Sequence, residues 1–163
     1  MSKDRYLQIR VTPTEKTAIR QAAARARMDM SAWVLARLLP APQARFQELI
    51  VALAEAGDAR RYAFADLNDF LSNVGPRELE QAVADPPAAA LEPYVANYVA
   101  AMVETAAGRF GSAPPPWTAD IPGLPEPVFG TPLASVRMHL LMSSPPAFRR
   151  RNIFIDSTIG DRV

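Results

Sequence analysis

The chain begins with a short segment in which apolar and polar side chains alternate. In RYLQIRV, three aliphatic residues are interleaved with three residues that can form hydrogen bonds: Leu7, Ile9 and Val11 against Tyr6, Gln8 and Arg10. A period of two is typical of a β-strand with one apolar face. We therefore predict a single strand over residues 5–11.

The pattern then lengthens to a helical one. Thr12, Pro13 and Glu15 have the positions of a helix cap, a first-turn proline and the acidic member of a capping box. An apolar stripe at helical spacing follows: Ala18, Ile19, Ala22, Ala23 and Ala26. Ser31 is the predicted cap of a second helix, whose buried face holds Trp33, Val34, Leu38 and Leu39, and Pro40 ends it.

Helical periodicity continues through the middle of the chain. The expected stripes are Phe46, Leu49, Ile50 and Leu53; Tyr62, Leu67, Phe70, Leu71 and Val74; Leu79 and Val83; and Tyr94, Tyr98, Ala101, Met102 and Thr105. Later, Thr131 and Pro132 are predicted to open a helix with the stripe Leu133, Val136, Leu140 and Leu141. The last residues allow three interpretations: a short strand around 153–155 that packs on the helices, a basic tail, or a flexible end. The apolar side chains there favour the first.

Prolines divide the chain further. Nine of the sixteen prolines lie between Pro114 and Pro146, which excludes a continuous helix and predicts a stiff, extended connector. The predicted fold class is mainly α. The predicted parts are residues 1–40, a strand and two helices; 41–110, an acidic helical region; and 111–163, a proline-rich connector with a helix and a tail.

Composition narrows the class of protein. An apolar content of 49% argues against disorder, and the absence of cysteine excludes disulfides and thiolate chemistry. No segment has the length of a membrane span or the pattern of a signal peptide, so we expect a cytoplasmic protein without membrane contact. No catalytic triad, phosphate-binding glycine loop or zinc spacing occurs. We therefore expect no enzyme activity, cofactor or metal.

Charge is segregated along the chain. Residues 1–40 hold eight Lys/Arg against three acids, a net charge of +5, whereas residues 41–110 hold five Arg against ten acids, a net charge of −5. Residues 111–163 are close to neutral at +1. A basic segment followed by an acidic one indicates a polyanion-binding N-terminal part and a separate task for the rest.

The lone strand has no evident partner in its own chain. A strand and two helices within about 40 residues are too small to be stable alone, and an unpaired strand edge invites pairing. Two antiparallel copies of residues 5–11 would solve both problems by forming a two-stranded ribbon, which fits the major groove of DNA. The alternative is a single-chain α+β fold whose basic residues are merely solvated.

Residues 4–39 resemble ribbon-helix-helix transcription factors of the Arc and MetJ type, in the form found in many bacterial antitoxins. The resemblance implies that Tyr6, Gln8 and Arg10 read bases, that Lys3 and Arg5 contact phosphates, and that the amides near Ser31 and Ala32 hold a phosphate. It also implies a dimer core of Leu7, Ile9, Val11, Ile19, Trp33, Val34 and Leu38. Arg27 stands where this family usually has glycine, so either the turn differs or Arg27 takes a left-handed torsion at about 1 kcal/mol.

The second half of the chain resembles small proteins encoded beside abortive-infection nucleotidyltransferase toxins. That resemblance implies a toxin as partner, of the nucleotidyltransferase class, and a partner-binding set of Trp117, Phe129, Phe148, Arg149, Arg150, Arg151 and Phe154. The leading hypothesis is an antitoxin that represses its own operon and neutralises a toxin. A second is a stand-alone regulator whose helical part senses a ligand or builds higher oligomers.

A third hypothesis, an enzyme, would use the acidic helices. Asp66 and Asp69 lie three residues apart, as a catalytic pair of carboxylates would, but no histidine accompanies them. A solvated acidic face is the favoured interpretation. His139, the single histidine, lies on a leucine-rich predicted helix and is expected to be a packed or surface residue rather than a ligand.

Overall fold

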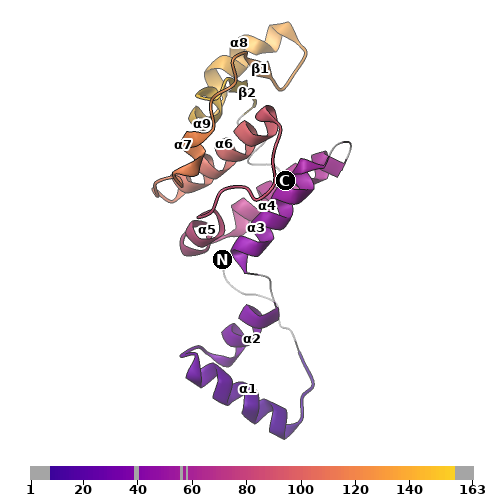
Figure 1. The fold of residues 1–163 in the computed structure, drawn as a ribbon, viewed down its shortest axis with the longest axis vertical. Coiled ribbons are helices and arrows are strands. Elements are labelled where there is room, and N and C mark those ends of the chain that lie inside the picture. Colours follow the sequence, from indigo (N-terminus) through magenta and orange to yellow (C-terminus); the bar gives the residue numbers. More distant parts are fainter. Residues whose placement is uncertain (1–7, 39–40, 56, 58, 157–163) are drawn as a thin grey trace. The chain divides into compact units, whose positions relative to one another are not determined.

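The computed structural model describes residues 8–38, 41–55, 57 and 59–156, and it is mainly helical, as predicted (63% helix, 3% strand). The chain divides into two compact units, Met1–Ala41 and Pro42–Val163. Figure 1 shows a helix pair in the first unit and a helical body with a small sheet in the second. Each unit is described by itself below. Within the described ranges, no helix is long and apolar enough to cross a membrane.

The N-terminal unit contains α1 (Pro13–Arg25) and α2 (Met30–Leu38). The predicted capping box begins α1: the Glu15 amide donates to the Thr12 hydroxyl at 3.3 Å, and the Thr12 amide donates to the Glu15 carboxylate at 2.7 Å. These hydrogen bonds from Thr12 lower the pKa of Glu15. The cap therefore favours the ionised carboxylate at the positive end of the helix.

The turn between α1 and α2 is a Schellman motif with an arginine in the glycine position. The Met28 amide donates to the Ala23 carbonyl at 3.0 Å and the Arg27 amide to the Ala24 carbonyl at 3.1 Å. Arg27 has a φ of 54°, which is the left-handed torsion that the sequence analysis gave as one of two alternatives. The end of α6 (Pro93–Arg109) has the same two hydrogen bonds with Gly111 at this position, at φ 65°.

The cap of α2 differs from the prediction. Asp29, not Ser31, precedes the helix, and its carboxylate accepts from the Ser31 amide at 2.7 Å and the Ala32 amide at 3.3 Å. Aspartate is as good a cap as serine, and Asp29 lies one residue before the first helical residue, Met30. The preceding turn ends at Met28, and this places Asp29 rather than Ser31 directly before the helix.

The second unit has a helical body followed by a small sheet. Its elements are α3 (Pro42–Ala54), α4 (Ala59–Asn73), α5 (Pro76–Ala82), α6, α7 (Trp117–Asp120), β1 (Val128–Phe129), α8 (Ala134–Ser143), α9 (Pro146–Arg149) and β2 (Ile153–Phe154). The predicted stripe of α3 forms its core face, because Phe46, Leu49, Ile50 and Leu53 are all buried. Leu67 and Leu71 of α4 and Leu79 of α5 join the same core.

Helix α6 lies at the centre of this unit, where it contacts α4, α5, α7 and α9. It is buried on nearly every side, including Val95, Val99 and Val103, and its alanines let neighbouring helices approach closely. Tyr98 packs edge-on against Phe64 of α4 and Phe148 of α9, with ring centroids 4.8 and 5.0 Å apart. Burial raises the pKa of Tyr98 to about 12.

The proline-rich segment packs on the helical body, and so it is not the extended connector that the sequence predicted. Trp117 is 7% exposed, and its indole nitrogen donates to the Val83 carbonyl at 2.8 Å. Asn97 on α6 donates to the Pro122 carbonyl at 3.0 Å. Prolines stiffen this segment without extending it, because tertiary contacts at several points fix its path.

The predicted C-terminal strand exists and packs back on the body. β2 pairs in parallel with β1, with Val128 opposite Ile153 and Phe129 opposite Phe154. The Phe129 and Phe154 rings stack at 5.1 Å. Ile153 and Ile155 are buried with the main core, so the sheet is continuous with the helical body.

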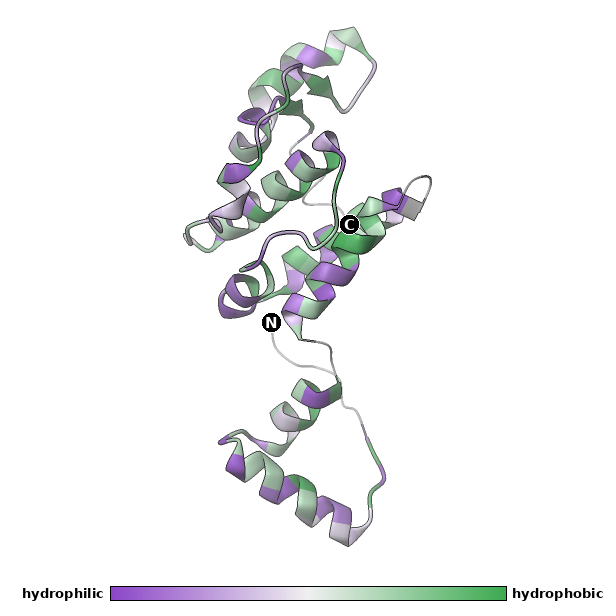
Figure 2. Ribbon diagram, viewed as in Figure 1, coloured by the Kyte–Doolittle hydropathy of each residue, from purple (hydrophilic) through white to green (hydrophobic). Residues whose placement is uncertain are grey.

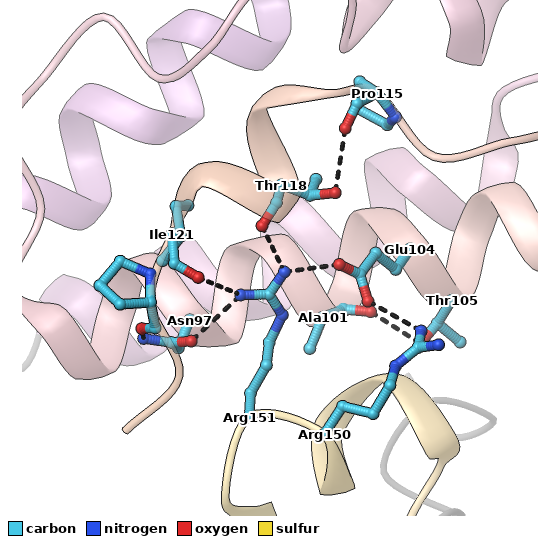
Figure 3. A network of polar contacts seen from close by, with 10 residues as sticks. Asn97, Ala101, Glu104, Thr105, Pro115, Thr118, Ile121, Arg150 and Arg151 are labelled. Carbon is cyan, nitrogen blue, oxygen red and sulfur yellow. Dashed lines mark hydrogen bonds and ion pairs between the residues drawn. The ribbon is translucent and has the colours of Figure 1, made fainter. Parts of the chain in front are cut away.

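A buried arginine ties the C-terminal segment to α6 (Figure 3). The Arg151 guanidinium donates to the Glu104 carboxylate, to the Asn97 side chain at 3.1 Å and to the Thr118 carbonyl at 2.6 Å. Arg150 reaches the other oxygen of Glu104 at 3.1 Å. The network joins three segments that are distant in sequence, and its polar groups are largely satisfied, as burial requires.

Two predicted buried stripes are wrong in part. Tyr62 of α4 is 74% exposed, and Ala63 takes its place in the core. α8 begins at Ala134, after the predicted Thr131–Pro132 start, and of its expected stripe only Leu140 is buried. Leu133 and Leu141 are exposed because α8 covers the sheet with one narrow face. Figure 2 colours the hydrophobic residues along the ribbon, those of α8 included, in green.

Candidate nucleic-acid interface

The N-terminal unit has almost no core of its own. Among its described residues, Ala23 is the single buried apolar side chain. Large apolar side chains are exposed instead: Ile9 at 55%, Val11 at 41%, Met28 at 41%, Met30 at 37% and Leu38 at 62%. Two short helices that leave this much apolar surface in water are not stable alone. The N-terminal unit therefore exposes the apolar side chains that a protein of this size would normally bury in a core.

The predicted dimer-core residues are among the incompletely buried side chains of this unit. Ile19 on α1 and Trp33 and Val34 on α2 are half-buried against each other's helices, whereas Ile9, Val11 and Leu38 are exposed. Leu7 lies outside the described residues. The Arg37 guanidinium stands over the Trp33 ring, 5.5 Å from its centroid. One chain thus positions these side chains without enclosing them.

The predicted base-reading residues precede α1. Gln8 and Arg10 are exposed and belong to no helix or strand in the single chain, and Lys3, Arg5 and Tyr6 lie outside the described residues. Residues 8–11 thus do not form the predicted strand on their own. A strand needs a second strand to pair with, and no described segment of this unit provides one.

The predicted phosphate site at the start of α2 is already occupied. The amides of Ser31 and Ala32 donate to the Asp29 carboxylate, so an incoming phosphate would have to displace a negative charge. Cations line the rest of the unit, since Arg10, Lys16, Arg20, Arg25, Arg27 and Arg37 are all exposed. Arg27 lies in the turn between α1 and α2, three residues before Met30, the first residue of α2.

Most of the predicted partner-binding residues belong to the interior of the second unit. Trp117, Phe148, Arg151 and Phe154 are each at most 8% exposed and contact their own chain. Phe129 is half-buried under the Arg137 guanidinium, 5.0 Å from the ring centroid, and Arg149 and Arg150 are exposed. Aromatic residues and arginines in a proline-rich segment suit a binding tail and a core anchor equally, and only the tertiary fold distinguishes the two.

The carboxylate pair that the sequence singled out lies on the surface of α4. Asp66 and Asp69 are both exposed on α4, beside Phe70 and Glu78, and His139 is exposed on α8. No cluster of three or more metal-ligating side chains occurs in the described part of the chain. The acids form a solvated face, which is the interpretation that the sequence favoured.

Comparison with known proteins bears on the N-terminal third. Residues 1–54 match the model of the NikA-like family, described as mobilization protein NikA. The match spans the N-terminal unit and α3, and it is consistent with the ribbon-helix-helix resemblance of residues 4–39. No curated protein and no solved structure matches the chain.

Proposed function

We propose that this protein is a homodimeric, double-stranded DNA-binding protein whose N-terminal unit reads DNA through a ribbon formed by two copies of residues 5–11. The observation that carries the proposal is the incomplete core of this unit, in which Ala23 alone is buried among the described residues. Pairing two copies would cover Ile9, Val11 and Leu38 and give each strand its partner. The NikA-like match over residues 1–54 supports the same assignment.

The charges of the unit suit a phosphate backbone. Residues 1–41 hold eight Lys/Arg against three acids, and the described cations are exposed. Arg10 and Gln8, on the polar side of the proposed ribbon, are side chains that pair with guanine and adenine in the major groove. Arg27 is a better phosphate contact than the amides of α2, because Asp29 occupies those amides.

The proposal extends to the task that this DNA binding serves. The matched family is described as a mobilization protein, and this favours a role at a DNA-transfer site over the antitoxin role that the second resemblance implied. Neutralisation of a toxin by the second unit stays a prediction that the comparisons do not support. Regulation of its own operon is compatible with either role.

Selection of preferred sites from a random duplex library by the full-length protein tests the proposal. We expect an inverted repeat, because a dimer presents the same reading surface twice. Arg10→Ala should weaken binding to the selected site by about 1 to 3 kcal/mol and relax preference at one position in each half-site. Lys3→Ala is the control, since loss of the phosphate contact expected of Lys3 weakens binding to all sequences alike and lowers the salt dependence.

Two outcomes would overturn the proposal. One is a protein that stays monomeric in the presence of the selected DNA. The other is unchanged sequence preference in Arg10→Ala. The position of the selected sequence in the genome then separates the roles: a site at the protein's own promoter indicates a regulator, and a site at a transfer origin indicates mobilization.

A further inference from the structure

Charge in the second unit is segregated between its two ends. Residues 42–126 hold five Arg against twelve acids, a net charge of −7. Residues 127–163, which include β1, α8, α9 and β2, hold five Arg against two acids, a net charge of +3. Glu104 is paired with Arg151 and Arg150, whereas Arg137 and Arg149 are exposed.

The cationic end carries an uncovered apolar ridge. Met138, Leu141 and Met142 on α8 are 69%, 39% and 76% exposed, and they follow one another at helical spacing on one side of the helix. Arg137 lies beside them, at the edge of an open hollow of about 710 Å³ lined also by Phe129, Pro127 and Glu126. Flexible methionines and an exposed helix face are typical of a docking surface.

The acidic end offers a hollow of complementary charge. A depression of about 380 Å³ on α3, α4 and α5 is lined by the acids Asp66, Asp69 and Glu78, by the apolar Phe70 and Val74, and by Asn73. Arg45 also lines it, but its guanidinium is paired with Glu48 at 3.2 Å. The acids and the apolar side chains are complementary to Arg137 and to the α8 ridge beside it.

We propose that the α8 ridge of one copy docks in the α4–α5 hollow of a second copy, so that the second units associate head to tail. Pairing of two α8 ridges with each other is disfavoured, because it would bring Arg137 of both copies together. A head-to-tail contact is heterologous, and it therefore continues from copy to copy instead of closing as a pair. This association is separate from the ribbon pairing of the N-terminal units.

The contact is expected to be weak by itself. α8 has ten residues and is about 15 Å long, and three side chains cannot bury the roughly 800 Å² per partner of a stable interface. Its strength would come from proximity, since neighbouring proteins on one DNA face each other at an effective concentration of order millimolar. The consequence for a DNA-bound protein is cooperative occupation of adjacent sites.

Sedimentation velocity of the full-length protein without DNA, at concentrations rising to the order of a millimolar that the weak contact needs, tests the contact. We expect assemblies at low salt that dissociate as the screening length falls from about 10 Å at 0.1 M to about 3 Å at 1 M salt. Arg137→Glu and Asp69→Arg should each raise the dissociation constant about 2- to 30-fold, because each replaces an attraction by a repulsion. The double variant Arg137→Glu/Asp69→Arg should regain the wild-type value.

Matched controls separate this contact from general effects of charge and folding. Arg61→Glu, exposed on α4 outside the hollow, changes the net charge by the same amount as Arg137→Glu and should leave association unchanged. Met138→Ser/Met142→Ser should weaken association at constant charge. Wild-type assemblies no larger than those of Arg137→Glu, or a double variant that does not recover, would overturn the proposal.

The result is also separable from the DNA-binding proposal. If the N-terminal units do not dimerise, salt-sensitive association that responds to Arg137→Glu still supports this contact. If the N-terminal units dimerise but the contact is absent, wild-type protein and Arg137→Glu should both sediment as dimers with no larger assemblies.

Discussion

The buried Glu104–Arg151 pair gives a sharp test of how the second unit is held together. The two side chains are 10% and 7% exposed, and Arg151 otherwise donates only to neutral oxygens of Asn97, Thr118 and Ile121. Glu104→Gln keeps the size of the side chain and one acceptor oxygen but leaves the guanidinium charge buried without a counter-charge. Breaking a buried pair in this way costs about 3 to 5 kcal/mol, and the remaining neutral acceptors place the expected loss near 3 kcal/mol.

Denaturant unfolding followed by the fluorescence of Trp117 measures this loss. The chain has two tryptophans, one in each unit, so a Trp33→Phe background makes Trp117 the single reporter of the second unit. Glu48→Gln is the control, because the Arg45–Glu48 pair is 45% and 57% exposed and should contribute less than about 0.5 kcal/mol. The slope of the free energy against denaturant should not change.

A double variant separates loss of the ion pair from loss of the buried charge. Glu104→Gln/Arg151→Met removes both charges, and we expect it to recover at least about 1 kcal/mol relative to Glu104→Gln alone. A loss below about 1 kcal/mol in Glu104→Gln would refute the reasoning. It would mean that water reaches the pair in solution and that the C-terminal segment is not fixed to α6 by this network.

Three further predictions concern other parts of the chain. Arg27→Gly should stabilise the N-terminal unit by about 0.5 to 1 kcal/mol in thermal unfolding, because glycine adopts the left-handed torsion without strain. The same variant should weaken DNA binding in an anisotropy titration. The control Arg25→Gly, inside α1, should instead destabilise the unit by about 1 kcal/mol. Thr12→Ala should cost about 1 kcal/mol of the same stability by removing the hydroxyl from the capping box. In an NMR titration the pKa of Glu15 should rise only in part, because the backbone amide of residue 12, the larger cause of its lowering, still donates to the carboxylate. Burial raises the pKa of Tyr98 from 10 to about 12, so the folded state favours the protonated phenol. The free energy of unfolding should therefore be unaffected by this group below pH 10 and should fall between pH 10 and 12. Alkaline unfolding followed by circular dichroism should show a smaller fall for Tyr98→Phe.

The sequence by itself determined the local structure where one residue pattern has one low-energy solution. Proline after a threonine cap, with glutamate in the third helical position, fixed the start of α1, and the apolar stripe of α3 fixed which face it buries. Both signals are contained within a few residues, so no distant contact can change them easily. The segregation of charge along the chain could also be determined from the sequence, since it requires only a count of the charged residues.

Tertiary structure decided the role of residues whose chemistry suits more than one place. Trp117, Phe148 and Arg151 are buried against the helical body, whereas Leu141 is exposed because no segment among the described residues covers that side of α8. Burial depends on which distant segments arrive at the same point, and a local pattern does not contain that information. For the same reason the alternation in residues 5–11 predicts a strand, but residues 8–11 form none in the single chain, where no described segment of the N-terminal unit provides a strand to pair with.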